Sequence, residues 1–179
     1  MFENLKLTSL SNYILIYLAR SPDKHYYLRE IARNLDISVG GCHKVLKDLV
    51  DRGLVKNFKR GKNSYFTIND ENPSIKYFKI FTNIQELTKT VKEIKSKSRK
   101  VVLFGSCADG LDTMESDIDI LLITENVEEI RKKLLGKVVN GRRIKPIIKL
   151  PHEYMKLKNR DRALYDQIES GIVLWRSNE

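Results

Sequence analysis

The segment from Val101 to Thr124, VVLFGSCADGLDTMESDIDILLIT, constrains the fold of this chain more than any other stretch. It predicts an apolar strand, a Gly-Ser corner, a polar loop and a second apolar strand that begins with Asp117 and Asp119. Successive residues of a strand point to opposite faces, so the two aspartates project to the same side. Neighbouring carboxylates repel each other, and a cation such as Mg²⁺ would relieve that repulsion. The sequence therefore predicts a metal site at the start of the second strand.

The composition is that of a globular protein. The chain has 179 residues, of which 41% are hydrophobic, enough for one ordinary core or two small ones. The longest apolar run of the first half, 13–19, is too short to cross a bilayer, so we expect no membrane partner. Cys42 and Cys107 have neither a CxxC nor a metal-ligand spacing, so we expect a reduced, cytoplasmic protein.

The positive charge is unevenly distributed along the chain. The net charge is +10, and residues 1–99 contain 19 Lys and Arg against 10 Asp and Glu. Residues 100–179 contain 14 against 13. This bias favours a nucleic-acid surface in the first half, although a generally basic proteome would produce the same excess.

Three helices followed by a hairpin are predicted in the first half. Apolar residues recur at helical spacing in two stretches, and a third helix is predicted between an N-cap, Ser38, and a stop signal, Gly53. A hairpin with a basic turn follows. The predicted helices are 9–20, 27–35 and 39–52, and the predicted strands are 54–58 and 64–68, with the turn at 59–63.

This order of elements resembles the winged helix-turn-helix domain of many prokaryotic transcription regulators. The resemblance covers about residues 8–70 and implies that the third helix enters the major groove of double-stranded DNA while the hairpin, or wing, touches the backbone. Winged helices also serve as protein–protein modules, but the charge bias favours DNA. The residues expected to contact DNA are Ser38, Gly40, Gly41, His43, Lys44 and Lys47 on the helix and Lys59, Arg60, Lys62 and Asn63 on the wing.

Two glycines, Gly40 and Gly41, lie early in the predicted third helix. Each is expected to cost about 1 kcal/mol of helix stability relative to alanine. A close approach to DNA would explain them, and so would a loosely wound start of the helix.

A long helix is predicted over 73–98, with Pro73 in its first turn. Its apolar stripe suits either a rigid connector or pairing with a second copy, because winged-helix regulators usually dimerise on two-fold sites. The charged stretch 95–100 marks the expected domain boundary. The predicted organisation is therefore 1–72, 73–99 and 100–179. The stripe comprises Phe78, Phe81, Ile84, Leu87, Val91 and Ile94.

The opening segment resembles the signature of the nucleotidyltransferase superfamily that includes DNA polymerase β, and more narrowly its small prokaryotic members. The resemblance rests on Gly105-Ser106, on Gly110 and on the run SDIDILL at 116–122. It implies an α/β domain with a mixed sheet, so the expected fold class is α+β with two domains. It also implies that Gly105 and Ser106 hold the phosphates of a nucleoside triphosphate. Asp117 and Asp119 would then bind Mg²⁺ and be catalytic.

The family normally uses a third carboxylate, on a later strand beside the first two. The corresponding strand, predicted over 142–150, contains no acid, and Lys145 or Lys149 stands about where the acid belongs. A lysine there repels a second metal and cannot act as a carboxylate base. Glu153 is a candidate substitute, and His152 is the other titratable candidate, better explained as a surface histidine.

The phosphate loop also departs from the commonest family pattern. Cys107 follows the Gly-Ser pair where an arginine or aromatic residue is frequent, and Asp109 precedes the loop glycine where a basic residue is frequent. Both departures weaken the expected phosphate binding.

The rest of the second half is predicted to be scaffold. We expect a helix over 127–138, one helix over 153–170 and a closing strand over 172–175 in which Trp175 serves packing. The helix over 153–170 is expected to bury Met155, Leu157, Leu164 and Ile168 in part.

Two functions of different classes follow from this reading. The favoured one is a nucleotide-linked transcription regulator that binds DNA and a magnesium complex of a nucleoside triphosphate. The alternative is an active nucleotidyltransferase that transfers a nucleoside monophosphate to a protein or small-molecule acceptor and releases pyrophosphate. The missing third acid favours the first function, and the pair of aspartates favours the second.

Overall fold

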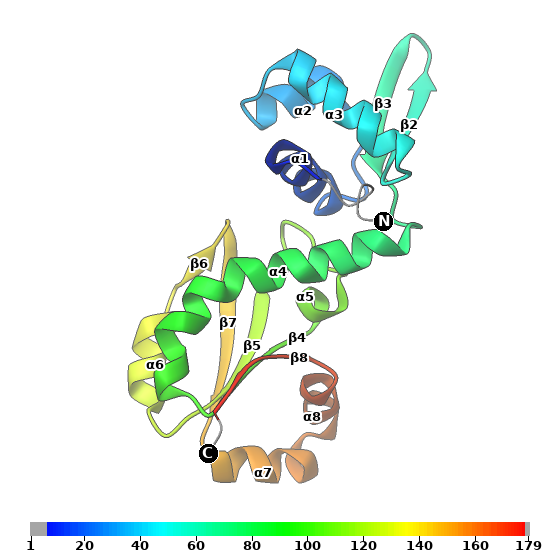
Figure 1. The fold of residues 1–179 in the computed structure, drawn as a ribbon. Coiled ribbons are helices and arrows are strands. Elements are labelled where there is room, and N and C mark those ends of the chain that lie inside the picture. The colour runs from blue at the N-terminus through cyan, green and yellow to red at the C-terminus, as the bar shows by residue number, and fades with distance from the viewer. Residues whose placement is uncertain (1–6, 178–179) are drawn as a thin grey trace, which may run out of the picture. The chain divides into compact units, whose positions relative to one another are not determined.

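The computed structural model describes residues 7–177, and the chain divides into two compact units, Met1–Tyr77 and Phe78–Glu179. Figure 1 labels most of the helices and strands of both units. None of the described helices is long and apolar enough to span a membrane.

The first unit packs three helices with a three-stranded antiparallel sheet of order β1-β3-β2. Its core contains Ile14, Leu18, Ile31, Leu46 and Leu49, each at most 1% exposed. These residues occupy one face of each helix, as their helical spacing predicts. The elements are α1 (Ser9–Ala19), β1 (Tyr26–Tyr27), α2 (Leu28–Asn34), α3 (Val39–Asp51), β2 (Val55–Arg60) and β3 (Asn63–Ile68).

Both predicted ends of α3 are confirmed. The Ser38 hydroxyl accepts a hydrogen bond from the Gly41 amide at 3.1 Å, which caps the helix. At the other end Gly53 has a φ of +68°, the left-handed conformation that ends many helices.

The hairpin is longer and its turn tighter than predicted. Arg60 pairs with Asn63 across β2 and β3, so only Gly61 and Lys62 form the turn. Gly61 has a φ of +60°, which a two-residue turn with glycine in its first central position requires. The predicted turn at 59–63 was too wide because basic side chains on strand ends resemble a loop in sequence.

The second unit is a five-stranded mixed sheet of order β6-β7-β5-β4-β8 with helices on both faces, which confirms the predicted fold class. The central pair β5 and β7 is parallel, and the other neighbours are antiparallel. The elements are α4 (Pro73–Ile94), the 3-10 helix η2 (Lys95–Lys97), β4 (Lys100–Phe104), α5 (Ser106–Asp109), β5 (Ile118–Ile123), α6 (Val127–Leu134), β6 (Val138–Val139), β7 (Arg142–Lys149), α7 (Pro151–Arg160), α8 (Arg162–Glu169) and β8 (Ile172–Arg176).

Alternating residues of the central strands pack on the two helical layers. Leu103 and Ile120 share one buried cluster with Leu87 of α4 and with α6. Leu121, on the opposite face, belongs to a second cluster with α7 and α8. The near-continuous apolar run of β5 follows from this burial on both faces.

The apolar stripe of α4 packs largely inside the second unit. Leu87 and Ile94 are at most 1% exposed and belong to its core, whereas Phe81 is 59% exposed. The two compact units therefore divide inside α4, between Tyr77 and Phe78, and not at the charged stretch 95–100.

Two predicted helices end earlier than expected. α6 ends at Leu134, and Val138–Val139 forms a short edge strand instead. The predicted helix over 153–170 is broken at Asp161, whose φ is −150° and whose side chain caps α8 by accepting from the Leu164 amide at 3.0 Å. Met155 is 74% exposed, so its predicted burial was wrong, while Leu157 and Ile168 are buried as expected.

Candidate functional site

The Gly-Ser corner between β4 and α5 requires its glycine for two reasons. Gly105 has a φ of +67°, a left-handed conformation that other residues rarely adopt. A Cβ atom at this position would lie 3.1 Å from Oδ2 of Asp119, so the aspartate packs directly against the corner. The predicted residues Gly105, Ser106 and Asp119 are thus brought together.

Asp117 and Asp119 lie at the start of β5, the central strand of the sheet, together with Lys145 from the neighbouring strand β7. Lys145 lies opposite Asp119 in the parallel register of β5 and β7. Its Nζ lies 2.6 Å from Oδ2 of Asp117. Of the two lysines that the sequence offered for the third-carboxylate position, the structure therefore selects Lys145.

The electrostatics of this cluster combine attraction and repulsion. Partial burial raises the pKa of Asp119, the ammonium of Lys145 opposes the shift, and the negative charge of Asp117 adds to it. The hydrogen bond to Asp117, followed by the attraction of its charge, raises the pKa of Lys145. Lys145 therefore carries its positive charge at neutral pH.

The predicted substitutes for the third acid do not reach this cluster. The Glu153 carboxylate accepts from the Leu150 amide at 2.9 Å and caps α7, and this hydrogen bond lowers its pKa. His152 is exposed on the same helix, as a surface histidine would be. Within residues 7–177, no three His, Cys, Asp or Glu side chains form a group that could hold a metal ion.

These residues do not fit the family's usual metal arrangement. That arrangement needs three carboxylates around the ions, and here the third position carries a cation that is already bound to one of the remaining two.

A buried polar network supports the loop between α5 and β5. Arg142, at the start of β7, donates to Asp112 at 2.8 Å, to Asn83 at 2.8 Å and to Glu86 at 2.8 Å. Arg142 is 2% exposed and Asp112 is 0% exposed. A buried charge without a partner is very unfavourable, so this network fixes α4, the loop and β7 to one another. The network is not visible in the sequence, because an arginine at the start of a strand is typical of a surface position.

Cys107 connects this network to the aspartate pair. Its thiol donates to the Asp117 carbonyl at 3.5 Å and accepts from Arg142 at 3.4 Å. Burial raises the pKa of the Cys107 thiol to about 11. Cys107, the first departure from the family pattern, is thus a residue of the core. Asp109, the second departure, is exposed.

The predicted DNA-contacting residues of α3 lie on its open face. Cys42, Leu46 and Leu49 are fully buried on the opposite face. The exposed residues are Ser38, Gly40, His43, Lys44 and Lys47, with Gly41 half-buried.

The two glycines of α3 have different structural environments. A Cβ atom at Gly41 would lie 2.9 Å from the capping Ser38 Oγ and 3.7 Å from Leu10 of α1. A Cβ atom at Gly40 would meet nothing within 4 Å. The contacts that a Cβ atom would make with Ser38 and Leu10 therefore explain why position 41 is a glycine. No contact among the described residues explains the glycine at position 40.

The wing presents all four of its predicted residues to solvent. Lys59, Arg60, Lys62 and Asn63 are exposed. Arg60 places its guanidinium 5.4 Å from the centre of the Phe58 ring, which orients it along the hairpin.

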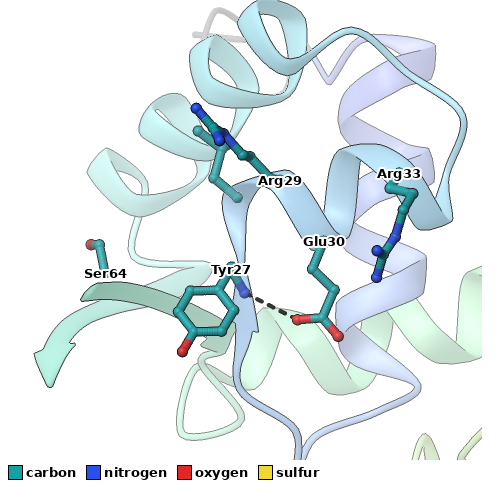
Figure 2. Close-up of a pocket in the computed structure, with 6 residues that line it drawn as sticks. Tyr27, Arg29, Glu30, Arg33 and Ser64 are labelled. Carbon is teal, nitrogen blue, oxygen red and sulfur yellow. Dashed lines mark hydrogen bonds between the residues drawn. The ribbon is translucent and has the colours of Figure 1, made fainter. Parts of the chain in front are cut away.

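A pocket that the sequence analysis missed lies beside α2 and β3 (Figure 2). Arg29 and Arg33, one helical turn apart, contribute two exposed guanidinium groups, and Glu30 between them accepts from the Tyr27 amide at 3.3 Å. The spacing of the two arginines was the signal available in the sequence. The lining residues are Tyr27, Leu28, Arg29, Glu30, Arg33 and Ser64.

Family models match both units of the chain. A model described as winged helix-turn-helix DNA-binding matches residues 14–56, and one described as nucleotidyltransferase domain matches residues 84–172.

One curated relative comes from Lactococcus lactis subsp. lactis (strain IL1403). It is YffB, whose name presents it as a candidate HTH-type transcriptional regulator. It is 34% identical over 76 residues, which are 42% of this chain and 48% of the relative. The chain thus spans about half the length of the curated relative that it matches.

Solved structures of Lactococcus lactis ZitR are also similar to part of the chain. A point mutant is 23% identical with a TM-score of 0.40, covering 51% of this chain and 62% of that one. A second mutant, solved in complex with DNA, is 23% identical with a TM-score of 0.40 and covers 52% and 64%.

Proposed function

Because this chain joins a winged helix-turn-helix domain to a nucleotidyltransferase domain, we propose that it is a DNA-binding transcription regulator controlled by a nucleotide. The winged helix would bind double-stranded DNA, and the C-terminal domain would bind a nucleoside triphosphate. The working compartment would be the cytoplasm, where its DNA and nucleotides are found.

The observation that carries the DNA proposal is the exposed basic face of the first unit. Lys44 and Lys47 on α3 and Lys59, Arg60 and Lys62 on the wing are all exposed, on the two elements that contact DNA in winged helices. The name of YffB supports the same function. Arg29 and Arg33 add positive charge that would suit backbone phosphates.

The DNA proposal is tested by removing charge from the wing. The double variant Arg60→Ala with Lys62→Ala should weaken binding to duplex DNA and reduce the slope of log K against log salt by about 2, one unit per lost phosphate contact. Electrophoretic mobility shifts over a salt series measure both. The matched control, Lys156→Ala with Arg160→Ala, removes the same charges from the exposed surface of α7. Equal behaviour of the two double variants would indicate a protein–protein module instead.

The nucleotide proposal is supported by the Gly105 corner. The left-handed Gly105 turns the chain sharply from β4 into α5, and Ser106 adds a half-buried hydroxyl next to it. Titrations with ATP, GTP, CTP and UTP followed by calorimetry test this directly. Ser106→Ala should weaken binding severalfold, while the control Ser170→Ala, on the exposed end of α8, should not.

A second candidate function is nucleotidyl transfer. It is favoured by one observation, the presence of two carboxylates, Asp117 and Asp119, on the side of the sheet that faces the Gly105 corner. Incubation with α-labelled nucleoside triphosphates and magnesium would reveal label on the protein itself or on lysate components. Label that disappears in Asp119→Asn would favour the enzyme over the regulator.

Binding to a two-fold DNA site as a homodimer remains a prediction. Its basis in the α4 stripe is weaker, because Leu87 and Ile94 pack within the same chain. Sedimentation equilibrium with and without DNA would determine the oligomeric state.

A further inference from the structure

The aspartate pair lies beside a cation of the protein itself, the ammonium group of Lys145. Lys145 extends from β7 to Asp117, with 2.6 Å between Nζ and Oδ2, and faces Asp119 in the strand register. This distance is that of a short, charge-assisted hydrogen bond. The repulsion between the two carboxylates, from which a metal was predicted, is therefore relieved without one.

We propose that the ammonium of Lys145 takes the place of a divalent metal in this domain, so that any nucleotide bound here is held without a resident metal ion. The part of this proposal that concerns a bound nucleotide rests on the proposed nucleotide binding. The part in which Lys145 replaces the metal concerns the site alone and can be tested with a metal ion and no nucleotide.

Charge and geometry both support this inference. A divalent cation at Asp117 would meet a positive charge within the same coordination distance, and like charges at such separations repel strongly. Mg²⁺ demands near-ideal octahedral oxygen ligands, and an ammonium has only donors to offer. The described part of the chain supplies no third carboxylate that would compensate.

The core also holds the backbone of Asp117 in place. The carbonyl of Asp117 accepts from the buried Cys107 thiol, and Cys107 in turn accepts from Arg142. Asp117 is therefore held by the core from the backbone side while Lys145 holds its carboxylate. Lys145 itself is 65% exposed, so its replacement does not open the core.

The decisive experiment is a titration with Mn²⁺ alone, followed by electron paramagnetic resonance. The wild-type protein should show no stoichiometric site, and Lys145→Asp, which introduces a third carboxylate, should bind one ion at least tenfold more tightly. The control is Lys149→Asp, which makes the same charge change opposite Ile123 at the other end of the strand pair. This control should behave as the wild type does.

Two results would overturn the inference. One is a wild-type protein that binds one Mn²⁺ as tightly as Lys145→Asp does, since a mobile lysine would then simply move aside. The other is a folded Lys145→Asp, by circular dichroism, that binds no better than Lys149→Asp. If Lys145→Asp does not fold, Lys145→Gln replaces it and should still bind Mn²⁺ severalfold more tightly than the wild type.

A second titration separates this inference from the proposed function. ATP affinity should be the same within twofold in EDTA and in magnesium. Binding that requires magnesium would overturn the inference while supporting the proposed nucleotide binding. If none of the four nucleoside triphosphates binds in either condition, the nucleotide proposal fails, and the Mn²⁺ titration still decides the role of Lys145.

Discussion

The two units of this chain differ in how the charged side chains of their candidate sites are arranged. The first unit leaves Lys44, Lys47 and Lys62 exposed, and none of them forms an ion pair with another described residue. The second unit buries Arg142 against Asp112 and pairs Lys145 with Asp117. Free surface cations suit a long polyanion that brings its own phosphates. Carboxylates that are already neutralised by the protein need no added cation, so the difference fits the proposed DNA-binding surface on one unit and the proposed metal-free site on the other.

The largest effect should come from the buried network of the second unit. Arg142→Met removes the guanidinium that donates to Asp112, Asn83 and Glu86, and Asp112 keeps only the longer ion pair with Lys79 at 3.9 Å and the hydrogen bond from Asn83. Breaking this buried network should cost about 3 kcal/mol of unfolding free energy. Urea denaturation measures it. Arg143→Met, on the exposed neighbouring residue, is the matched control and should cost less than about 0.5 kcal/mol. A small loss in Arg142→Met would mean that the network is not a structural support.

This network also marks the limit of what the sequence could predict. The Gly-Ser corner, the aspartate pair and the three-helix-plus-hairpin order were all predictable, because each is a local pattern with a local cause. The pairing of Arg142 with Asp112 was not, because it joins the start of β7 to a loop 30 residues earlier in the chain. The choice of Lys145 over Lys149 likewise needed the strand register, which no local pattern contains.

The next effect compares one thiol from each unit. Burial raises the pKa of Cys42 and of Cys107 to about 11, so both thiols should react about 100-fold more slowly at pH 8 than a thiol with a pKa of 9.0. Alkylation followed by mass spectrometry measures each site. In Arg142→Met, Cys107 should become reactive while Cys42 stays protected. The substitution destabilises the second unit, which contains Cys107, and not the first unit, which contains Cys42. Equal exposure of both thiols would show that the two units unfold together.

A smaller effect distinguishes what the two glycines of α3 contribute to stability from what they contribute to DNA binding. Gly40→Ala adds a methyl group into open space and should stabilise the protein by up to about 1 kcal/mol. Gly41→Ala should stabilise it less or destabilise it, because its Cβ would disturb the Ser38 cap. Thermal unfolding tests the pair, and DNA titrations of both variants follow. A loss of DNA affinity in the stabilised Gly40→Ala would assign Gly40 to the interface, whereas unchanged affinity would remove it from the list of contacts.

The smallest effect concerns Asp119, whose pKa in the folded protein is raised, first by partial burial. A carboxyl group with a raised pKa binds its proton more tightly in the folded state than in the unfolded state. Its contribution to stability therefore declines as pH rises from the ordinary value of 3.8 through the raised pKa. Asp119→Asn should abolish this decline and stabilise the protein at neutral pH by no more than about 0.5 kcal/mol, because solvent screens the charge. Chemical denaturation at several pH values measures both curves. If Asp119→Asn is instead less stable than the wild type at pH 7, the attraction of Asp119 to Lys145 outweighs the cost of its burial, and the internal cation stabilises both carboxylates.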